Sequence, residues 1–541
     1  MDWRGMMIPH FTKTRIKMIT LVISLIIFAS LLLHISSNHP RNRSLSLIND
    51  ACSHTLYAAL CRSTLSAIGN STDVIEFAID RTVKRVQAAR TSVADHFAAH
   101  QDLSAARDCV ELLDQTLYEL ESAMAELSSL PSSRPRSYAN INTLLSAAMT
   151  NEQTCINGFL DLEQVHSLGS RGNGRYLHKL LTPISHMISN ILALIKHVES
   201  SSSFRETIKK GERMVGGGEW ARRKSKSARP NVVVDRDGSG RYRLIGEAVA
   251  AAPNMSKKTY VIKINAGVYK ENVVIPREKM NIMLVGDGMK STIITGSRSL
   301  ADGFSTFESA TLTVVGDKFI ARDITIENTA AAEKHQAVAL RVTSNAAFYR
   351  CGILSYQDTL YAHSLRQLYQ ECTIEGTIDF IFGNAAAVFN KCRILVRRPL
   401  RGQRNTITAQ GRDDPNQNTG ISLHKCTIEA APELNSTERK HFPTYLGRPW
   451  RKYSRVFVGN SYLGELIHPR GWLEWPQYSN ADTVEYVECR NYGPGAAMRR
   501  RISWAGYRNN CTVEMVKQFT VAEFLHGEDD WLESTVIPIF G

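Results

Sequence analysis

One residue position recurs along the second half of this 541-residue chain, and it constrains the fold more than any other feature. Similar short segments place Ile324, Cys351, Cys372, Cys392 and Cys426 at one phase, with successive spacings of 27, 21, 20 and 34 residues. A constant phase with uneven spacing is typical of stacked strands with variable loops between them. It predicts a right-handed parallel β-helix, whereas a propeller would need longer and more regular repeats.

The texture of the sequence divides the chain into regions. In residues 231–541, short runs of Val, Ile, Thr and Phe alternate with Gly, Asn and Asp, which predicts an all-β domain. Residues 45–200 are rich in Ala and Leu with apolar residues at three- and four-residue spacing, which predicts an all-α four-helix bundle. Residues 201–230 form a basic linker, in which residues 221–224 are either a processing site or a solvated charge run.

Residues 1–44 indicate export. The apolar run 18–35 follows basic residues, and its length lies between a signal-peptide core and a full membrane span, so a cleaved signal and a signal anchor both fit. Either one keeps the basic flank in the cytoplasm and sends the rest of the chain into the secretory lumen. Sequons for glycosylation in that compartment occur at Asn42, Asn70, Asn254, Asn435 and Asn510.

Ten cysteines in an exported chain are expected to include disulfides. Cys52 and Cys61 can close a local loop. Cys109 and Cys155 lie on separate predicted helices and can join them. The cysteines at one phase of the β-helix are within bridging distance of their neighbours, although a column of buried thiols would also pack as small apolar groups.

Two aspartates have matched positions in neighbouring repeats. Asp358 follows Cys351 by seven residues, and Asp379 follows the next cysteine of the repeat by seven as well. In a coiled stack the two therefore lie about one coil apart, or about 4.8 Å. Two carboxylates so close cannot both ionise easily, which prepares one as base or nucleophile and the other as acid. The alternative is a pair of ordinary turn aspartates, but the matched phase favours an enzyme.

Polar and aromatic residues near this pair are further candidates. Gln357 adjoins the first aspartate and Gln336 lies one coil earlier, and their amides can stabilise an oxyanion or be simple surface hydrogen-bonders. Arg448 can pair with a carboxylate of the enzyme or of an acidic substrate. Trp450 and Trp472 offer flat faces to a sugar ring, and an ordinary core position is the alternative for each.

The net charge of +13 suits an acidic partner, whether nucleic acid, an anionic membrane or an acidic polysaccharide. The sequence lacks the common nucleic-acid motifs, a phosphate-binding loop, a dinucleotide fingerprint, the zinc motif His-Glu-x-x-His and the serine-hydrolase elbow. We therefore expect a carboxylate mechanism with no metal and no cofactor.

From about Ala51 to Phe540 the chain resembles plant pectinesterases that carry an inhibitor-like pro-region. The resemblance rests on GVYKENV, HQAVALRV, SYQDTLY, GTIDFIFGNAA, YLGRPW and GWLEW, in the order of that family. The helical region resembles the inhibitor domain of the family in ACSHTLYAALC, ARDCVELLD and LLSAAMTNEQTCINGF. The resemblance implies hydrolysis of methyl esters on galacturonate units of pectin, with release of methanol and pectate during cell wall modification.

The resemblance also implies roles for single residues. Asp379 becomes the nucleophile, Asp358 the general acid and then base, and Gln357 and Gln336 the amides that stabilise the oxyanion. The substrate-binding residues are Thr306, Gln336, Arg448 and Trp450, to which we add Trp472. The implied disulfides join Cys372 to Cys392, Cys52 to Cys61 and Cys109 to Cys155, while the pairing of Cys351, Cys426, Cys489 and Cys511 stays open.

Methyl-esterified homogalacturonan is the implied substrate, and proteinaceous pectinesterase inhibitors and a subtilisin-like processing protease are the implied partners. Nucleic acid is not expected, and membrane contact is expected only through the N-terminal segment. The implied location is the cell wall, with a membrane-anchored precursor as the alternative.

Other readings remain open. The helical region is expected to be autoinhibitory, a folding aid or a separate binding module. Two other β-helical enzymes are alternatives: a pectate lyase, which would need calcium and yield unsaturated products, and a polygalacturonase, which would create reducing ends.

Overall fold

The computed structural model describes residues 26–27, 48–68, 73–98, 104–129, 138–166, 171–200, 229–435, 437–475, 481–525 and 532. Nearly all of the predicted export segment and residues 201–228 of the predicted linker lie outside these residues, so the predictions made for them are not tested. Within the described ranges, none of the helices has the length and apolar character needed to cross a bilayer.

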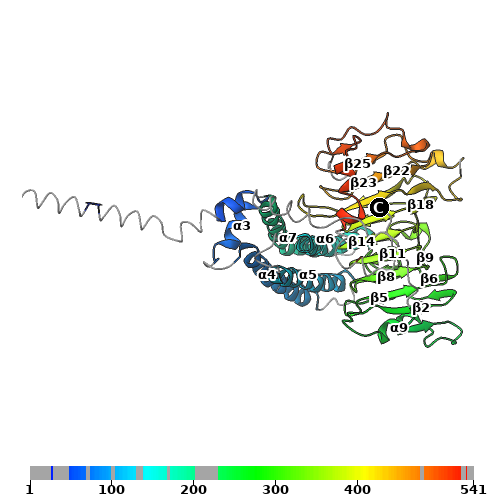
Figure 1. Ribbon diagram of the computed structural model, residues 1–541, viewed down its shortest axis with the longest axis horizontal. Coiled ribbons are helices and arrows are strands. Elements are labelled where there is room, and N and C mark those ends of the chain that lie inside the picture. The colour runs from blue at the N-terminus through cyan, green and yellow to red at the C-terminus, as the bar shows by residue number, and fades with distance from the viewer. Residues whose placement is uncertain are drawn as a thin grey trace, which may run out of the picture.

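The N-terminal region is a helical bundle (Figure 1). Its long helices pack side by side, and α4 begins at Asp73, whose carboxylate accepts a hydrogen bond from the Ile75 amide at 2.8 Å. The helices are α3 (Ala58–Leu65), α4 (Val74–His96), α5 (Ser104–Ser129), α6 (Ala139–His166) and α7 (Arg171–Ser200). The predicted bundle is confirmed, but the short α3 and a helical turn at 48–53 precede the four long helices, so the helix count exceeds the prediction.

The C-terminal region is a parallel β-helix of three sheets, and this prediction is confirmed (Figure 1). The 11-stranded sheet contains β1 (Val232–Val234), β2 (Tyr260–Ile264), β5 (Ile282–Val285), β8 (Phe319–Arg322), β11 (Ala346–Tyr349), β14 (Arg366–Gln370), β17 (Ala386–Asn390), β20 (Gly420–His424), β23 (Arg455–Gly459), β25 (Glu485–Cys489) and β26 (Tyr507–Arg508).

The other two sheets complete each coil. The 8-stranded sheet contains β3 (Gly267–Lys270), β6 (Thr292–Gly296), β9 (Thr325–Asn328), β12 (Gly352–Leu354), β15 (Thr373–Gly376), β18 (Arg393–Val396), β21 (Thr427–Ala430) and β24 (Tyr462–Leu463). The 7-stranded sheet contains β4 (Val273–Ile275), β7 (Leu312–Val314), β10 (Leu340–Val342), β13 (Leu360–Ala362), β16 (Ile381–Gly383), β19 (Asn405–Gln410) and β22 (Thr444–Pro449).

Short helices lie at one end of the β-helix and against its 11-stranded sheet. At the first coil, α9 (Ile245–Ala251) contacts β1, β2 and β4. Later in the chain come α10 (Val513–Lys517) and α11 (Val521–Phe524), and α11 contacts β17 and shares a buried apolar cluster with that sheet. Short 3₁₀ turns interrupt the loops at η3 (Leu300–Asp302), η4 (Ala332–Lys334), η5 (Arg439–His441) and η6 (Pro494–Ala496).

The phase read from the cysteine spacing is the phase of the 8-stranded sheet. Gly352 pairs in register with Thr373, and each directly follows a cysteine of the repeat. The residue before each of these cysteines has a positive φ, 49° at Arg350, 55° at Glu371 and 53° at Lys391. The same left-handed turn therefore recurs on successive coils and brings the chain into this sheet.

The predicted bridge between Cys372 and Cys392 is wrong, because both are free thiols, as are Cys351 and Cys426. The sulfurs of Cys372, Cys392 and Cys426 instead contact main-chain oxygens of a neighbouring coil, as in the 3.2 Å contact of Cys392 with the carbonyl of Tyr369. All four thiols are buried and form a column, which is the alternative that the phase argument left open.

Disulfides form elsewhere. The structure joins Cys52 to Cys61, Cys109 to Cys155 and Cys489 to Cys511. The first two lie in the helical bundle and match the pairs expected there. The third links β25 to the segment before α10, and the sequence had not assigned it.

The bundle packs against the outer face of the 7-stranded sheet. Phe307, Val338, Tyr361, Phe382 and Ala409 of the β-helix share one buried apolar cluster with residues of α4, α5, α6 and α7. The interior of the β-helix has a separate core made only of its own residues. The β-helix therefore has a core of its own, whereas the core of the bundle extends onto the β-helix, where the two regions meet (Figure 1).

Candidate active site

The two aspartates stand on adjacent coils where the chain enters the 7-stranded sheet. Asp358 precedes β13 and Asp379 precedes β16, and these strands pair in register from Leu360 with Ile381. Both aspartates have left-handed φ values, 60° and 50°. The amide of Asp358 donates to the carbonyl of Ile378 at 3.0 Å, which fixes the two turns against each other. Strained turns of this kind concentrate at functional sites.

Asp379 is held from two further coils. Arg448 of β22 forms a bidentate ion pair with it, and Nε donates to Oδ1 at 2.8 Å. The hydroxyl of Thr406 on β19 donates to the same oxygen at 2.6 Å and accepts a bond from the Asp379 amide at 2.9 Å. The side chain of Asp379 is only 9% exposed. A bidentate guanidinium and a hydroxyl fix its orientation.

Asp358 belongs to the same electrostatic site. Burial lowers the pKa of Arg448, but the charge and hydrogen bonds of Asp379 and then the charge of Asp358 outweigh it, so this pKa is raised. Arg448 therefore stays protonated beside two carboxylates. A fixed cation next to one carboxylate and a second carboxylate one coil away make an asymmetric acid–base pair.

The two glutamines are also neighbours. Gln336 and Gln357 pair as an isolated parallel bridge, and the amide of Ala337 donates to the carbonyl of Gln357 at 3.2 Å. Gln357 directly precedes Asp358 in the chain. Both glutamines are half-buried, and they lie on neighbouring coils beside the turn of Asp358.

Two predicted substrate residues lie along the same face. Trp450 follows Arg448 by two residues, and its ring packs edge-on against Phe382 of β16 with ring centroids 6.1 Å apart. Thr306 is buried in the turn after η3, next to Phe307 of the cluster shared with the bundle. Both positions are therefore beneath or beside the docked helices.

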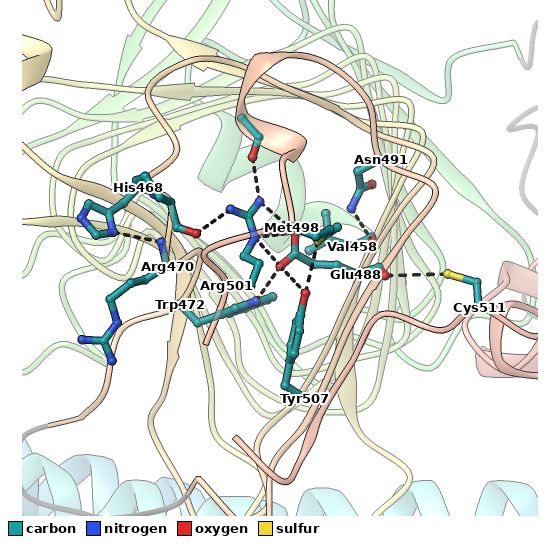
Figure 2. Close-up of polar contacts among 12 residues, drawn as sticks. Val458, His468, Arg470, Trp472, Glu488, Asn491, Met498, Arg501, Tyr507 and Cys511 are labelled. Atoms are coloured by element: carbon teal, nitrogen blue, oxygen red, sulfur yellow. Dashed lines mark hydrogen bonds and ion pairs between the residues drawn. The ribbon is translucent and has the colours of Figure 1, made fainter. Parts of the chain in front are cut away.

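Trp472 does not lie at the site, and its prediction as a sugar platform is wrong. Its side chain is 0% exposed within the core of the β-helix. Its indole N–H donates to Glu488 at 3.0 Å, and Figure 2 shows it beside the buried ion pair of that glutamate with Arg501 and beside Tyr507. Trp472 therefore satisfies a buried polar network and has no face for a ligand.

The sequence interpretation missed Trp475. The guanidinium of Arg448 lies 4.0 Å from the centroid of its ring, so the cation that holds Asp379 is sandwiched against an aromatic face. Trp475 follows Trp472 by an odd number of residues, and alternate residues of an extended segment face opposite sides. The sequence therefore offered a signal that the two rings face different sides.

One group of described residues has the composition of a metal site. Asp50, His54 and His197 bring their ligand atoms within 4.8 Å of one another, and the rings of His54 and His197 stack with centroids 4.2 Å apart. This group lies in the helical bundle and includes neither aspartate of the carboxylate site.

The helical bundle lies against the strands that follow the two aspartates. Thr154 of α6 contacts Nε2 of His363 at 2.9 Å, immediately after β13, and Thr150 accepts from Asn384 at 2.9 Å after β16. The side chain of Asn157 accepts from Arg451 at 2.6 Å, next to Trp450. Helix α6 therefore lies across the strands that follow both aspartates.

Comparisons with known proteins agree with this geometry. The family model described as pectinesterase matches residues 231–528, and the model described as plant invertase/pectin methylesterase inhibitor matches residues 46–194. Pectinesterase/pectinesterase inhibitor U1 of Solanum lycopersicum is 41% identical over 529 residues, covering 91% of this chain and 88% of the relative. Pectinesterase 3 of Citrus sinensis is 41% identical over 536 residues, covering 93% and 89%.

A solved structure, the pectin methylesterase from carrot, is 53% identical with a TM-score of 0.57 and covers 59% of this chain and 99% of its own. That share is close to the part of this chain that forms the β-helix. The chain therefore belongs to the pectinesterase family and carries an N-terminal domain of the plant invertase/pectin methylesterase inhibitor family.

Proposed function

We propose that this carboxylic ester hydrolase removes methyl esters from galacturonate units of pectin, with Asp379 as nucleophile and Asp358 as proton donor and acceptor. One observation carries the assignment of roles: Arg448 and Thr406 hold Asp379, while Asp358 lies one coil away. A carboxylate that a guanidinium and a hydroxyl hold in one orientation is suited to attack, and a second carboxylate one coil away can exchange a proton with the leaving group and with water.

The proposed reaction has two halves. A carboxylate oxygen of Asp379 attacks the ester carbonyl, Gln336 and Gln357 stabilise the oxyanion, and the bond to the methoxy group breaks as Asp358 protonates it to methanol. Asp358 then takes a proton from a water whose oxygen attacks the acyl-enzyme. This step releases Asp379 and leaves a galacturonic acid, which ionises.

The expected result is methanol release from methyl-esterified pectin by the full chain after cleavage in the linker and removal of the bundle. A lyase would instead form unsaturated products in a calcium-dependent manner, and a glycosidase would form new reducing ends. The position of Gln336 and Gln357 on neighbouring coils, with Gln357 next to Asp358, favours acyl transfer over both. Methanol, absorbance of unsaturated products and reducing ends are measured on one sample, and chain cleavage without methanol would contradict the proposal.

The proposal extends to location and partners. The chain is secreted to the cell wall, where its net charge of +13 favours retention on polyanionic pectin. The described sequon asparagines Asn254, Asn435 and Asn510 are exposed, which suits a glycoprotein. Separate pectinesterase inhibitors and a processing protease of the subtilisin type are its proposed protein partners.

We further propose that the bundle is autoinhibitory. Its support is the burial of Tyr361 and Phe382 together with bundle residues, and the contacts of α6 beside β13 and β16. A polysaccharide needs this face to reach Asp379. The bundle and the substrate therefore compete for one surface.

The ring of Trp475 is proposed to position Arg448, and through it the nucleophile. Trp475→Ala in the bundle-free enzyme is expected to lower kcat about fivefold to tenfold with little change in KM, because loss of a partly buried cation–π contact costs about 1 kcal/mol. Steady-state methanol release measures both constants. Trp475→Phe should retain most of kcat, and Tyr492→Ala removes an exposed ring as the matched control. An unchanged kcat in Trp475→Ala would contradict the positioning role.

A further inference from the structure

Arg341 lies on the outer face of the 7-stranded sheet, in line with the catalytic residues. It pairs in register with Tyr361, which pairs with Phe382, and the same row continues through Ala409 to Arg448. At one coil spacing per step, Arg341 lies roughly 19 Å from Arg448 along this row. Its strand neighbours belong to the interior core, so its own side chain points outward. The row is therefore an aromatic floor with an arginine at each end.

In the full chain the guanidinium of Arg341 is buried but poorly paired. Its side chain is 6% exposed, and an ion pair joins its Nη2 to Glu111 Oε1 at 3.6 Å. Among the described residues, its Nε and Nη1 atoms have no hydrogen-bond partner. The centroid of the Phe307 ring lies 3.3 Å from its Cζ atom. Burying a cation without full pairing is costly, so the docked bundle does not satisfy this group.

The groups that cover Arg341 are carboxylates of the pro-region. Glu111 and Asp108 both lie on α5, and Asp108 accepts a hydrogen bond from Ser305 in the turn that holds Thr306. The charge of Arg341 acts on Asp108 as well as on Glu111. Beside this contact, a cavity of about 850 Å³ separates α5 from the first coils of the β-helix. The space between the bundle and the β-helix thus continues past Arg341, which does not close it.

Building on the proposed function, we propose that Arg341 binds the free carboxylate of an already de-esterified galacturonate, and that Glu111 occupies its place while the bundle is docked. A guanidinium forms two parallel hydrogen bonds with a carboxylate, and the neutral methyl ester cannot match them. The bundle-free enzyme therefore prefers esters that have free acids a few units away, and it extends blocks of its own product.

The test uses the full chain, cut in the linker after folding and freed of its bundle. The kcat/KM for methanol release is measured on two pectins of equal length, one nearly fully methyl-esterified and one half de-esterified. Arg341→Gln is expected to lower the preference for the half de-esterified pectin about tenfold through KM, as loss of a charged hydrogen bond implies. It is also expected to weaken inhibition by unesterified oligogalacturonate about tenfold.

Control variants and measurements separate the effect of the charge of Arg341 from effects on folding and on the ester hydrolysis itself. Arg393→Gln removes an exposed arginine from the 8-stranded sheet and should leave the preference unchanged, while Arg341→Lys should restore part of it. Thermal unfolding of each variant reports the fold. An unchanged preference in Arg341→Gln, or an equal loss on both pectins, would overturn the inference. Absence of methanol from the parent enzyme on both pectins would instead overturn the proposed function.

Discussion

Asp379→Asn is expected to lower kcat for methyl ester hydrolysis at least about a thousandfold, because the amide keeps the shape of the carboxylate but cannot attack a carbonyl. Thr406 and Arg448 hold both oxygens of the Asp379 side chain. A water molecule could therefore act as the nucleophile in its place only by displacing these two residues. Methanol release by the bundle-free enzyme measures the effect. Single-turnover kinetics should show the loss in the first methanol formed, since the acyl-enzyme never forms.

The control must account for the lost ion pair. Removing one partner of a buried pair costs about 3 kcal/mol of stability, and Arg448 remains in place without its counter-charge. Asp287→Asn also removes an ion pair, that with Lys263, but at a 40% exposed position outside the 7-stranded sheet, and it should retain full activity. If Asp379→Asn kept more than about a tenth of kcat while folded, Asp379 would not be the nucleophile.

Cleavage in the linker followed by removal of the helical bundle is expected to raise activity on pectin at least about a hundredfold. The bundle is tethered to the face that it covers, which gives it an effective concentration in the millimolar range or above. Methanol release is compared for the intact chain, the cut chain before separation, and the separated β-helix. The cut but unseparated sample is the matched control and should stay largely inhibited at mildly acidic pH.

Asn157→Ala probes the contact by a second route. It removes the hydrogen bond from Arg451 without touching a residue of the carboxylate site and should raise the activity of the cut, unseparated sample. Equal rates for the intact chain and the separated β-helix would show that the bundle does not inhibit. The pro-region would then be a folding aid or a separate binding module.

The inhibition should weaken as pH rises. Burial and then the charge of Glu308 raise the pKa of Asp108 to about 8 in the docked chain, so the docked state holds a proton that the released bundle gives up near pH 4. The free energy of docking therefore becomes less favourable as the pH rises from the pKa of Asp108 in the released bundle to its pKa in the docked chain. His363 acts in the opposite sense below about pH 6.5, because burial and then Arg341 lower its pKa and its protonation favours release. Together they predict release mainly above pH 6.5.

Asp108→Asn should remove most of this loss at alkaline pH. The amide still accepts the hydrogen bond from Ser305 but has no charge to bury. Activity of the cut, unseparated chain is measured from pH 5 to pH 8 and divided by that of the separated β-helix. If Asp108→Asn showed the same release at alkaline pH, the release would have to come from other groups. Asp414 is one such group, because burial also raises its pKa.

The site was predictable from the sequence to the extent that its residues recur at one position of the repeating coil. A parallel β-helix repeats one coil geometry, so equal spacing from a repeated position puts Asp358 and Asp379 on the same turn of adjacent coils. The family motifs supplied Arg448, which lies far along the chain but pairs directly with Asp379. Trp472 and Trp475 show the limit, because motif membership does not tell which side chain faces the core and which faces the groove.

The sequence by itself determined the two regions, the coiled repeat and the matched aspartates, because hydrophobic period and coil phase are local properties of the chain. Only the tertiary structure decided that Cys372 and Cys392 remain thiols, that Trp475 backs Arg448, and that α5 and α6 cover the groove with Arg341 beneath them. These outcomes depend on distances between groups far apart in the chain. Such distances are set by how the bundle and the β-helix pack, which no local pattern encodes.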